Sequence, residues 1–279
     1  MGSIFGGGPK NMDEPLAKKR RTKPNYILDS NILKVECKRK EYGEGESMFF
    51  TALTMGLRDV AQYLLDIGTN IDEIDGRYDE TALHFFARSN KLQKIDFLIR
   101  NHANLEATDI YGHTPLFDAI SNGHLKAIQR LIRAGANVNV QSLTEGAPLH
   151  AACTLKQPKA KLVLDLLLLG GVIPDLVDNS GKTALHHIAA KGYCTCIVAL
   201  MVAHFNINAK DNNGSTPLHL ATDQETIRTL IRYHADIDAQ DINGCTALHL
   251  AIKTKNEKAV DVLFDNNARL TARDRRLKN

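Results

Sequence analysis

The sequence predicts an all-α repeat fold, and three observations carry that prediction. A tetrapeptide with the consensus Thr-Ala/Pro-Leu-His recurs six times along the chain. The copies are almost evenly spaced, with gaps of 33, 33, 36, 33 and 30 residues between their first positions. Apolar residues follow each copy at helical spacing. The copies begin at Thr81, Thr114, Ala147, Thr183, Thr216 and Thr246. A period of this size indicates stacked units that bury their apolar faces against their neighbours.

Two segments precede the first repeat. Residues 1–25 are expected to form a disordered basic tail, because they contain too few apolar groups to offset the entropy of ordering. This tail contains a cluster of basic residues, namely Lys18, Lys19, Arg20, Arg21 and Lys23. The cluster resembles a monopartite nuclear localisation signal, and a merely solvated tail is the alternative. Residues 26–46 carry several apolar side chains and are expected to form an N-terminal cap or a linker.

The third unit illustrates how the sequence builds one repeat. Gly112 suits the positive-φ corner of a tight turn, where a side chain would clash. Thr114 can cap the helix that follows, and Pro115 falls at the first helical position, where a missing N–H costs little. A second helix follows at the same apolar spacing, and we expect it to end at Gly135 in the left-handed conformation.

A period near 33 residues that carries Thr-Pro-Leu-His resembles the ankyrin repeat. The resemblance implies a solenoid of paired antiparallel helices with short β-turn fingers, here about seven repeats and fourteen helices over residues 47–272. It also implies that the histidine of each tetrapeptide hydrogen-bonds within its own turn and to the adjacent repeat. Ser47 stands for the threonine in a degenerate first repeat. Residues 273–279 remain as a basic C-terminal tail.

Two repeats depart from the common length. The fourth has three extra residues, expected between its helices near residues 154–159, and it has Ala147 in place of the capping threonine. The sixth is three residues short, and Asp223-Gln224-Glu225 is expected to replace its inter-helix loop. Neutral drift explains both changes, and the alternative is a local change of curvature that shapes a partner surface.

Composition excludes several classes of protein. The chain is 43% hydrophobic and 24% charged, as in soluble globular proteins. No apolar run approaches the ~18 residues of a membrane span, and residues 1–10 lack the apolar segment of a secretory signal. The net charge of +3 is concentrated near the N-terminus, so the array lacks the broad basic face of a nucleic-acid binder. The five cysteines show no framework spacing, which favours a reducing compartment.

No catalytic, cofactor or metal site is expected. Gly181-Lys182-Thr183 resembles the end of a phosphate-binding loop, but Leu176 occupies the position where that loop needs glycine. Cys194 and Cys196 have neither zinc-ligand spacing nor a second pair. No serine, cysteine or carboxylate recurs beside the histidines as a catalytic triad would require. We therefore expect no enzyme activity, no cofactor and no bound metal.

A partner protein is expected to bind the concave surface that the resemblance implies, which consists of turn tips and first helices. Large apolar side chains occupy three consecutive tips, a pattern typical of a binding hot spot. The candidate binding residues are Arg77, Tyr78, Ile110, Tyr111, His113, Leu143, Asn122 and Lys191. The positions expected to complete the groove are Arg88, Ser89, Ser121, Ala190, Lys253 and Thr254. The alternative is that the apolar tips simply pack on one another.

The leading hypothesis is a monomeric, non-catalytic interaction protein of nucleus and cytoplasm, similar in architecture to the nuclear inhibitor-of-kappa-B relatives. Two alternatives are an adaptor subunit of a ubiquitin ligase or phosphatase, and a pathogen effector that binds host proteins. Lys34-Val35-Glu36-Cys37 lies where phosphatase-targeting subunits carry Lys-Val-x-Phe, but it lacks the aromatic residue. The resemblance also marks Asn139 and Asn208 as positions where ankyrin proteins can be hydroxylated by an asparaginyl hydroxylase.

Overall fold

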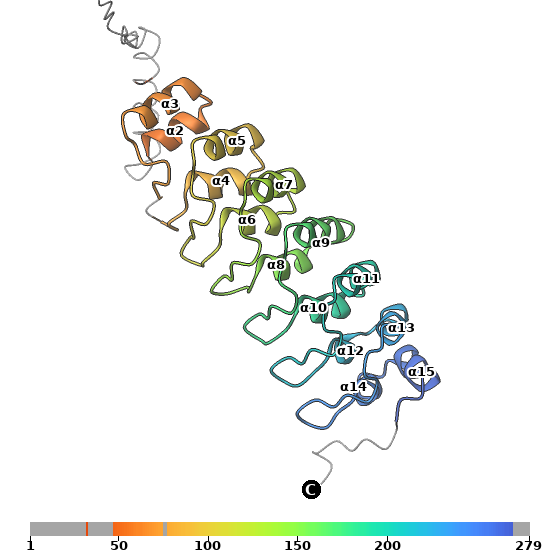
Figure 1. Ribbon diagram of the computed structural model, residues 1–279. Helices are drawn as coiled ribbons and strands as arrows, with labels where there is room; N and C mark the ends of the chain where they lie inside the picture. Colours follow the sequence, from red (N-terminus) through yellow and green to blue (C-terminus); the bar gives the residue numbers. More distant parts are fainter. Residues whose placement is uncertain (1–31, 33–46, 75–76, 270–279) are drawn as a thin grey trace, which may run out of the picture.

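The computed structural model describes residues 32, 47–74 and 77–269. In these ranges fourteen α-helices form seven antiparallel pairs in an elongated stack (Figure 1). The first helices of the pairs are α2 (Met48–Thr54), α4 (Ala82–Arg88), α6 (Pro115–Ser121), α8 (Pro148–Thr154), α10 (Ala184–Lys191), α12 (Pro217–Leu220) and α14 (Ala247–Lys253). The second helices are α3 (Arg58–Asp66), α5 (Leu92–Arg100), α7 (Leu125–Arg133), α9 (Lys159–Leu169), α11 (Cys194–Val202), α13 (Gln224–Arg232) and α15 (Glu257–Asp265). The predicted number and pairing of the helices are confirmed.

The helices form two layers around one core. From α4 onwards each first helix packs on the next first helix, and from α5 onwards each second helix packs on the next second helix (Figure 1). We call these the inner and outer layers. Leucines at the same place in each tetrapeptide fill the core between them, and each is at most 2% exposed. They include Leu116, Leu185, Leu218 and Leu248. Because each repeat packs mainly on its neighbours, the core runs the length of the stack.

The local signals in the third repeat act as expected. The Thr114 hydroxyl accepts a hydrogen bond from the Phe117 N–H at 3.3 Å, and Pro115 begins α6. Gly112 and Gly135 have φ values of 75° and 97°, in the region that favours glycine. In the first repeat Ser47 caps α2, since its Oγ accepts from the Phe50 N–H at 3.2 Å.

The structure corrects both expectations about repeat length. The loop of the fourth repeat, residues 155–158, is only one residue longer than the three-residue loop of the third, and the other two extra residues lengthen α9 to eleven residues. In the sixth repeat the missing residues come from α12, which has four residues where α6 has seven. Asp223 lies in the loop as the cap of α13, and its Oδ1 accepts from the Thr226 N–H at 2.9 Å.

The expected tails and most of the expected cap lie outside the described residues. Ile32 is the described residue of the 26–46 segment, and it is helical, half-buried and packed against the core. The basic cluster at Lys18–Lys23 also falls outside the described ranges. Extended pairing within those ranges is limited to an isolated bridge between Ile74 and Thr81. None of the described helices combines the length and the apolar character needed to span a membrane.

Candidate protein-binding surface

Buried histidines join consecutive repeats beneath the fingers. The Nδ1 of His84 accepts from the N–H of Thr81 at 3.2 Å and lies 2.9 Å from its hydroxyl, and its Nε2 donates to the carbonyl of His113 at 3.0 Å. The same two hydrogen bonds, one at Nδ1 within the repeat and one at Nε2 to the next repeat, recur at His150, His186 and His219. Burial lowers the pKa of each of these four histidines, which keeps the rings neutral. The role that the resemblance implied for them is confirmed.

A carboxylate shapes most of the fingers. The Oδ1 of Asp109 accepts from the backbone N–H groups of Tyr111 at 2.9 Å and His113 at 2.8 Å. The same pair of bonds recurs at Asp178, Asp211 and Asp241. Ser142 replaces the aspartate in the fourth finger, where its hydroxyl accepts from the Glu145 N–H at 2.8 Å. The turns are therefore held by local bonds that do not use the side chains at the tips.

Backbone hydrogen bonds connect the fingers of repeats two to four. The Ile110 N–H donates to the Tyr78 carbonyl at 3.1 Å, and the Leu143 N–H donates to the Tyr111 carbonyl at 2.9 Å. The tip side chains nevertheless remain accessible: Tyr78, Ile110, Tyr111 and Leu143 are 40%, 45%, 44% and 71% exposed. We call these four residues the tip patch. Neighbouring tips thus meet through their backbones while the patch keeps a large exposed apolar area.

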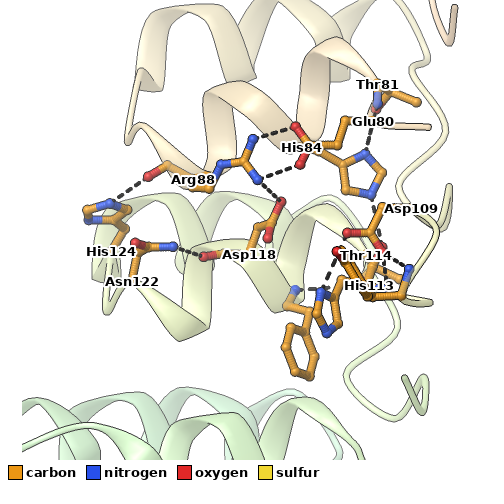
Figure 2. Close-up of polar contacts among 12 residues, drawn as sticks. Glu80, Thr81, His84, Arg88, Asp109, His113, Thr114, Asp118, Asn122 and His124 are labelled. Atoms are coloured by element: carbon orange, nitrogen blue, oxygen red, sulfur yellow. Dashed lines mark hydrogen bonds and ion pairs between the residues drawn. The ribbon is translucent and has the colours of Figure 1, made fainter. Parts of the chain in front are cut away.

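A charged cluster joins α4, the residues just before it and α6 (Figure 2). Arg88 on α4 makes a bidentate ion pair with Glu80, and its Nη1 lies 3.9 Å from Oδ2 of Asp118 on α6. Asp118 is only 7% exposed, and its Oδ2 has no hydrogen-bond partner among the described residues. Burial raises the pKa of Asp118 to about 7; Arg88 opposes this shift, whereas Glu80 and Asp109 add to it. We call Glu80, Arg88 and Asp118 the charged cluster.

His113 lies at the foot of the third finger and is turned into the protein. Its ring stacks on Phe117 with 4.2 Å between centroids, and its Nδ1 lies 3.5 Å from Asp109. Its side chain is 14% exposed, and its buried Nε2 has no partner within the described part of the chain. His113 therefore supports the finger from which Tyr111 projects.

Of the other candidate residues, Arg77 adjoins the tip patch and Asn122 and Lys191 lie apart from it. Arg77 is exposed beside Tyr78. Asn122 is the C-terminal cap of α6 and donates from Nδ2 to the Asp118 carbonyl at 2.9 Å. Lys191 ends α10 and donates to the Thr154 carbonyl at 2.9 Å. Asn122 and Lys191 are exposed, but they lie at the ends of the inner helices away from the fingers.

Sequence reasoning missed Glu80 and Asp118 as members of the site, and it also missed Phe85. Phe85 is 36% exposed on α4, and its ring meets those of Phe50 and Phe86 at 5.1 and 5.3 Å. The sequence did contain a pattern that could have identified Phe85 and Asp118. It lies four positions after the first residue of each tetrapeptide. That position holds Phe85, Asp118, Ala151, His187, Leu220 and Leu250. This position varies strongly while the tetrapeptide hardly changes, and its exposed fraction ranges from 1% at Ala151 to 36% at Phe85.

His187, at the equivalent position on α10, also contacts a carboxylate. Its Nε2 lies 2.7 Å from Oδ2 of Asp178. Burial alone would raise the pKa of Asp178, but hydrogen bonds from the Lys182 N–H, His187 and the Ser180 N–H together lower it. No three His, Cys, Asp or Glu side chains converge as metal ligands within the described residues.

These observations place the chain in a class of repeat proteins. Their helix pairs stack in an array, and their fingers and inner helices expose a surface that varies along the stack. A family model described as ankyrin repeats matches three stretches, residues 48–142, 149–241 and 187–274. The chain belongs to the ankyrin repeat family. Ankyrin repeats are protein–protein interaction modules and are generally non-catalytic.

The chain matches a small part of two much longer curated relatives. The E3 ubiquitin-protein ligase KEG of Arabidopsis thaliana is 27% identical over 157 residues, which is 55% of this chain and 10% of that protein. The nuclear factor NF-kappa-B p105 subunit of Gallus gallus is 30% identical over 149 residues, 52% of this chain and 15% of that protein. The matched segments are thus a small part of these relatives.

A solved structure agrees with the fold. The human ASB11 ankyrin repeat domain superposes with a TM-score of 0.64 and 22% sequence identity, and the match covers 78% of this chain and 98% of that domain. At this identity the likeness concerns the fold alone.

Proposed function

We propose that the array binds a partner protein through the tip patch and the adjoining charged cluster, as a monomeric, non-catalytic module. The observation that carries the proposal is the exposure of four large apolar side chains on three consecutive fingers. Their fingers are connected by backbone bonds, so the patch is held in one arrangement before any partner arrives. A preorganised apolar patch with charged groups at its border is the usual anatomy of a binding hot spot.

The charge of the cluster indicates what the partner should bring. The cluster places two carboxylates, Glu80 and Asp118, around one guanidinium, that of Arg88, so acidic groups outnumber basic ones in it. A partner segment with apolar residues for the tips and a Lys or Arg beside them would complement this border.

For the cellular setting, we propose a regulator in the nucleus and cytoplasm, similar in architecture to the inhibitor-of-kappa-B relatives. The similarity to the p105 subunit over about half of this chain supports this proposal. The basic residues Lys18 to Lys23 support it as a nuclear localisation signal.

A second candidate is a substrate-binding module of a ubiquitin ligase, which the similarity to KEG supports. The two candidates predict different companions. A regulator should co-purify with a transcription factor, whereas the adaptor should co-purify with ligase subunits.

Affinity purification with quantitative mass spectrometry tests the binding surface and separates these candidates. The bait is compared with a Tyr78→Ala/Tyr111→Ala double variant, and with Ile67→Ala as a matched control. Ile67 is 60% exposed, but it follows α3 in the outer layer. Because alanine at a hot spot costs about 2 kcal/mol or more, we expect the double variant to lose the partner and the control to retain it. Equal recovery by a double variant that melts normally would place the binding surface elsewhere.

A further inference from the structure

The outer layer of helices changes character in the middle of the stack. We compare three positions in each outer helix: its last residue and the residues four and seven positions earlier. In α7 these are Arg133, Gln129 and Lys126, and all three are exposed. In α13 the same positions hold Arg232, Arg228 and Glu225, again all exposed. Charged or amide side chains at these positions are normal for a solvated helix face.

The two helices between them, α9 and α11, carry aliphatic residues at four of these six positions, and the other two hold Asp165 and Thr195. Leu162 and Leu169 of α9 are 46% and 85% exposed, and Val198 and Val202 of α11 are 41% and 72% exposed. The two helices are neighbours in the outer layer (Figure 1). We call these four residues the outer patch. A contiguous exposed apolar patch on a soluble protein commonly marks an interaction site.

Packing of the array does not account for the outer patch. The opposite faces of the two helices supply the core, with Val163, Leu164 and Leu167 of α9 fully buried. Ile197 and Leu200 of α11 are fully buried as well. Both helices therefore expose aliphatic side chains on a second face, which in α9 also carries the ion pair between Lys161 and Asp165. A helix that is apolar all round is normally buried on all sides.

The borders of the outer patch are basic. On the α7 side Lys126 and Arg133 are exposed, and on the α13 side Arg228 and Arg232 are exposed. Acidic groups are few here and paired: Asp165 binds Lys161 at 2.6 Å, and Glu225 lies 3.5 Å from Arg232. An incoming segment with carboxylates along both edges would complement these borders.

We propose that the outer patch is a second docking surface, which takes an amphipathic helix of a partner protein whose apolar stripe is bordered by Glu or Asp. Neighbouring parallel helices about 10 Å apart leave a shallow groove in which such a helix packs. The outer patch lies on the second helices of the pairs, whereas the tip patch lies on the fingers between repeats (Figure 1). Two partners can therefore bind at once, which makes the array a bridge between them.

Fluorescence anisotropy with the full chain and two labelled peptides tests the proposal. Both peptides are hydrocarbon-stapled helices of about 20 residues with the same leucine stripe, flanked by Glu in one and by Lys in the other. We expect the Glu peptide to bind at least about tenfold more tightly than the Lys peptide at low salt. Leu169→Gln/Val202→Gln should weaken the Glu peptide more than about tenfold, because both aliphatic contacts are lost. The control Ile67→Gln should leave binding unchanged.

A second variant keeps the outer patch and removes only its borders. Arg133→Gln/Arg228→Gln should bring the affinities of the two peptides together. The proposal is overturned if the Glu peptide fails to bind at about 1 mM, or binds the Leu169→Gln/Val202→Gln variant as well as the original chain. It is also overturned if sedimentation shows a dimer that this variant converts to monomer, since the occupant would then be a second copy of the chain.

Discussion

Asp118 is the residue whose chemistry departs furthest from what its repeat requires. The next repeat has Ala151 at the equivalent position, so the framework does not need a carboxylate there. A carboxylate at 7% exposure loses hydration, and Arg88 at 3.9 Å replaces only part of it. Because the Asp118 carboxylate does not stabilise the fold, we attribute its presence to a role in the candidate binding surface.

Replacing Asp118 by Asn should stabilise the fold at neutral pH. The pKa of Asp118 is about 7 in the folded protein and about 4 in the unfolded chain, so the folded state binds the proton more tightly between these values. The stability that this proton confers is present below about pH 4 and is lost as the pH rises through 7. The advantage of Asp118→Asn over the original protein should therefore grow between about pH 5 and pH 8 in urea unfolding curves.

Asp118 shares its surroundings with Glu80, Asp109 and Arg88, so a matched control is needed. Glu80→Gln removes one of the carboxylates that raise the pKa of Asp118 and leaves Asp118 itself in place, so the growth of stability with pH that is specific to Asp118→Asn should be absent from it. If the advantage of Asp118→Asn is the same at both pH values, Asp118 is ionised throughout and the raised pKa is wrong.

The two asparagines expected as hydroxylation positions have a structural role. The Oδ1 of Asn139 accepts from the Ile173 N–H at 2.8 Å, and the Oδ1 of Asn208 accepts from the Asp236 N–H at 2.8 Å. Each side chain thus ties the base of one finger to the next repeat. Hydroxylation of either residue stays a prediction.

Among the elements, the fingers depend most on close backbone approach. Gly181, with φ of 73°, lies where an added Cβ would come within 2.8 Å of the Asn212 backbone nitrogen in the next finger. Gly135 also has positive φ, but an added Cβ there would meet no atom within 4 Å. The two glycines therefore separate the effect of conformation from the effect of packing between fingers.

Gly181→Ala should destabilise the array more than Gly135→Ala. Both substitutions place alanine at positive φ, which costs about 1–2 kcal/mol. Gly181→Ala must in addition push the fifth and sixth fingers apart, so we expect at least ~1 kcal/mol more from denaturant unfolding. Equal losses of unfolding free energy for the two variants would show that the fingers can move apart at no energetic cost.

For the whole molecule, position along the stack should decide how much a core residue matters. Leu116 and Leu248 are 0% and 1% exposed at equivalent positions, so cavity formation alone predicts ~2–5 kcal/mol for either change to Ala. Leu116 has a described repeat on either side, whereas Leu248 lies in the last repeat that the structure describes, and an end repeat can fray while the stack persists. Denaturant melts should give a larger loss for Leu116→Ala, and equal losses would contradict nearest-neighbour coupling.

Cellular distribution is the second prediction for the whole chain. Changing Lys18, Lys19, Arg20 and Arg21 to Ala should shift a fluorescent fusion from nucleus to cytoplasm, because import receptors read clustered positive charge. The melting curve should not move, since the cluster precedes the array. An unchanged distribution, measured by microscopy beside a Lys38→Ala/Lys40→Ala control, would show that the cluster is only a solvated tail.

The local signals of the sequence were sufficient for the framework. The helix ends are set by local interactions of Thr114, Pro115 and Gly135, which reach only a few residues along the chain. These ends can therefore be predicted without knowing how the neighbouring repeats pack. The loss of three residues in the sixth repeat was interpreted wrongly, because a loop and a helix end are both tolerant of deletion and only packing chooses between them. In the structure α12 is three residues shorter than α6, and Asp223 caps α13.

By itself the sequence determined a seven-repeat ankyrin array and the exposed tips at Tyr78, Ile110, Tyr111 and Leu143. Only the tertiary structure decided that Arg88 would lie between Glu80 and Asp118, because Asp118 belongs to the next repeat. It also decided which leucines of α9 enter the core and which form the outer patch with α11, since both faces of that helix are apolar in sequence. The physical reason is the sequence separation of the contacts. Turns and helix caps depend on residues a few positions apart, whereas the surfaces depend on contacts between residues about one repeat apart.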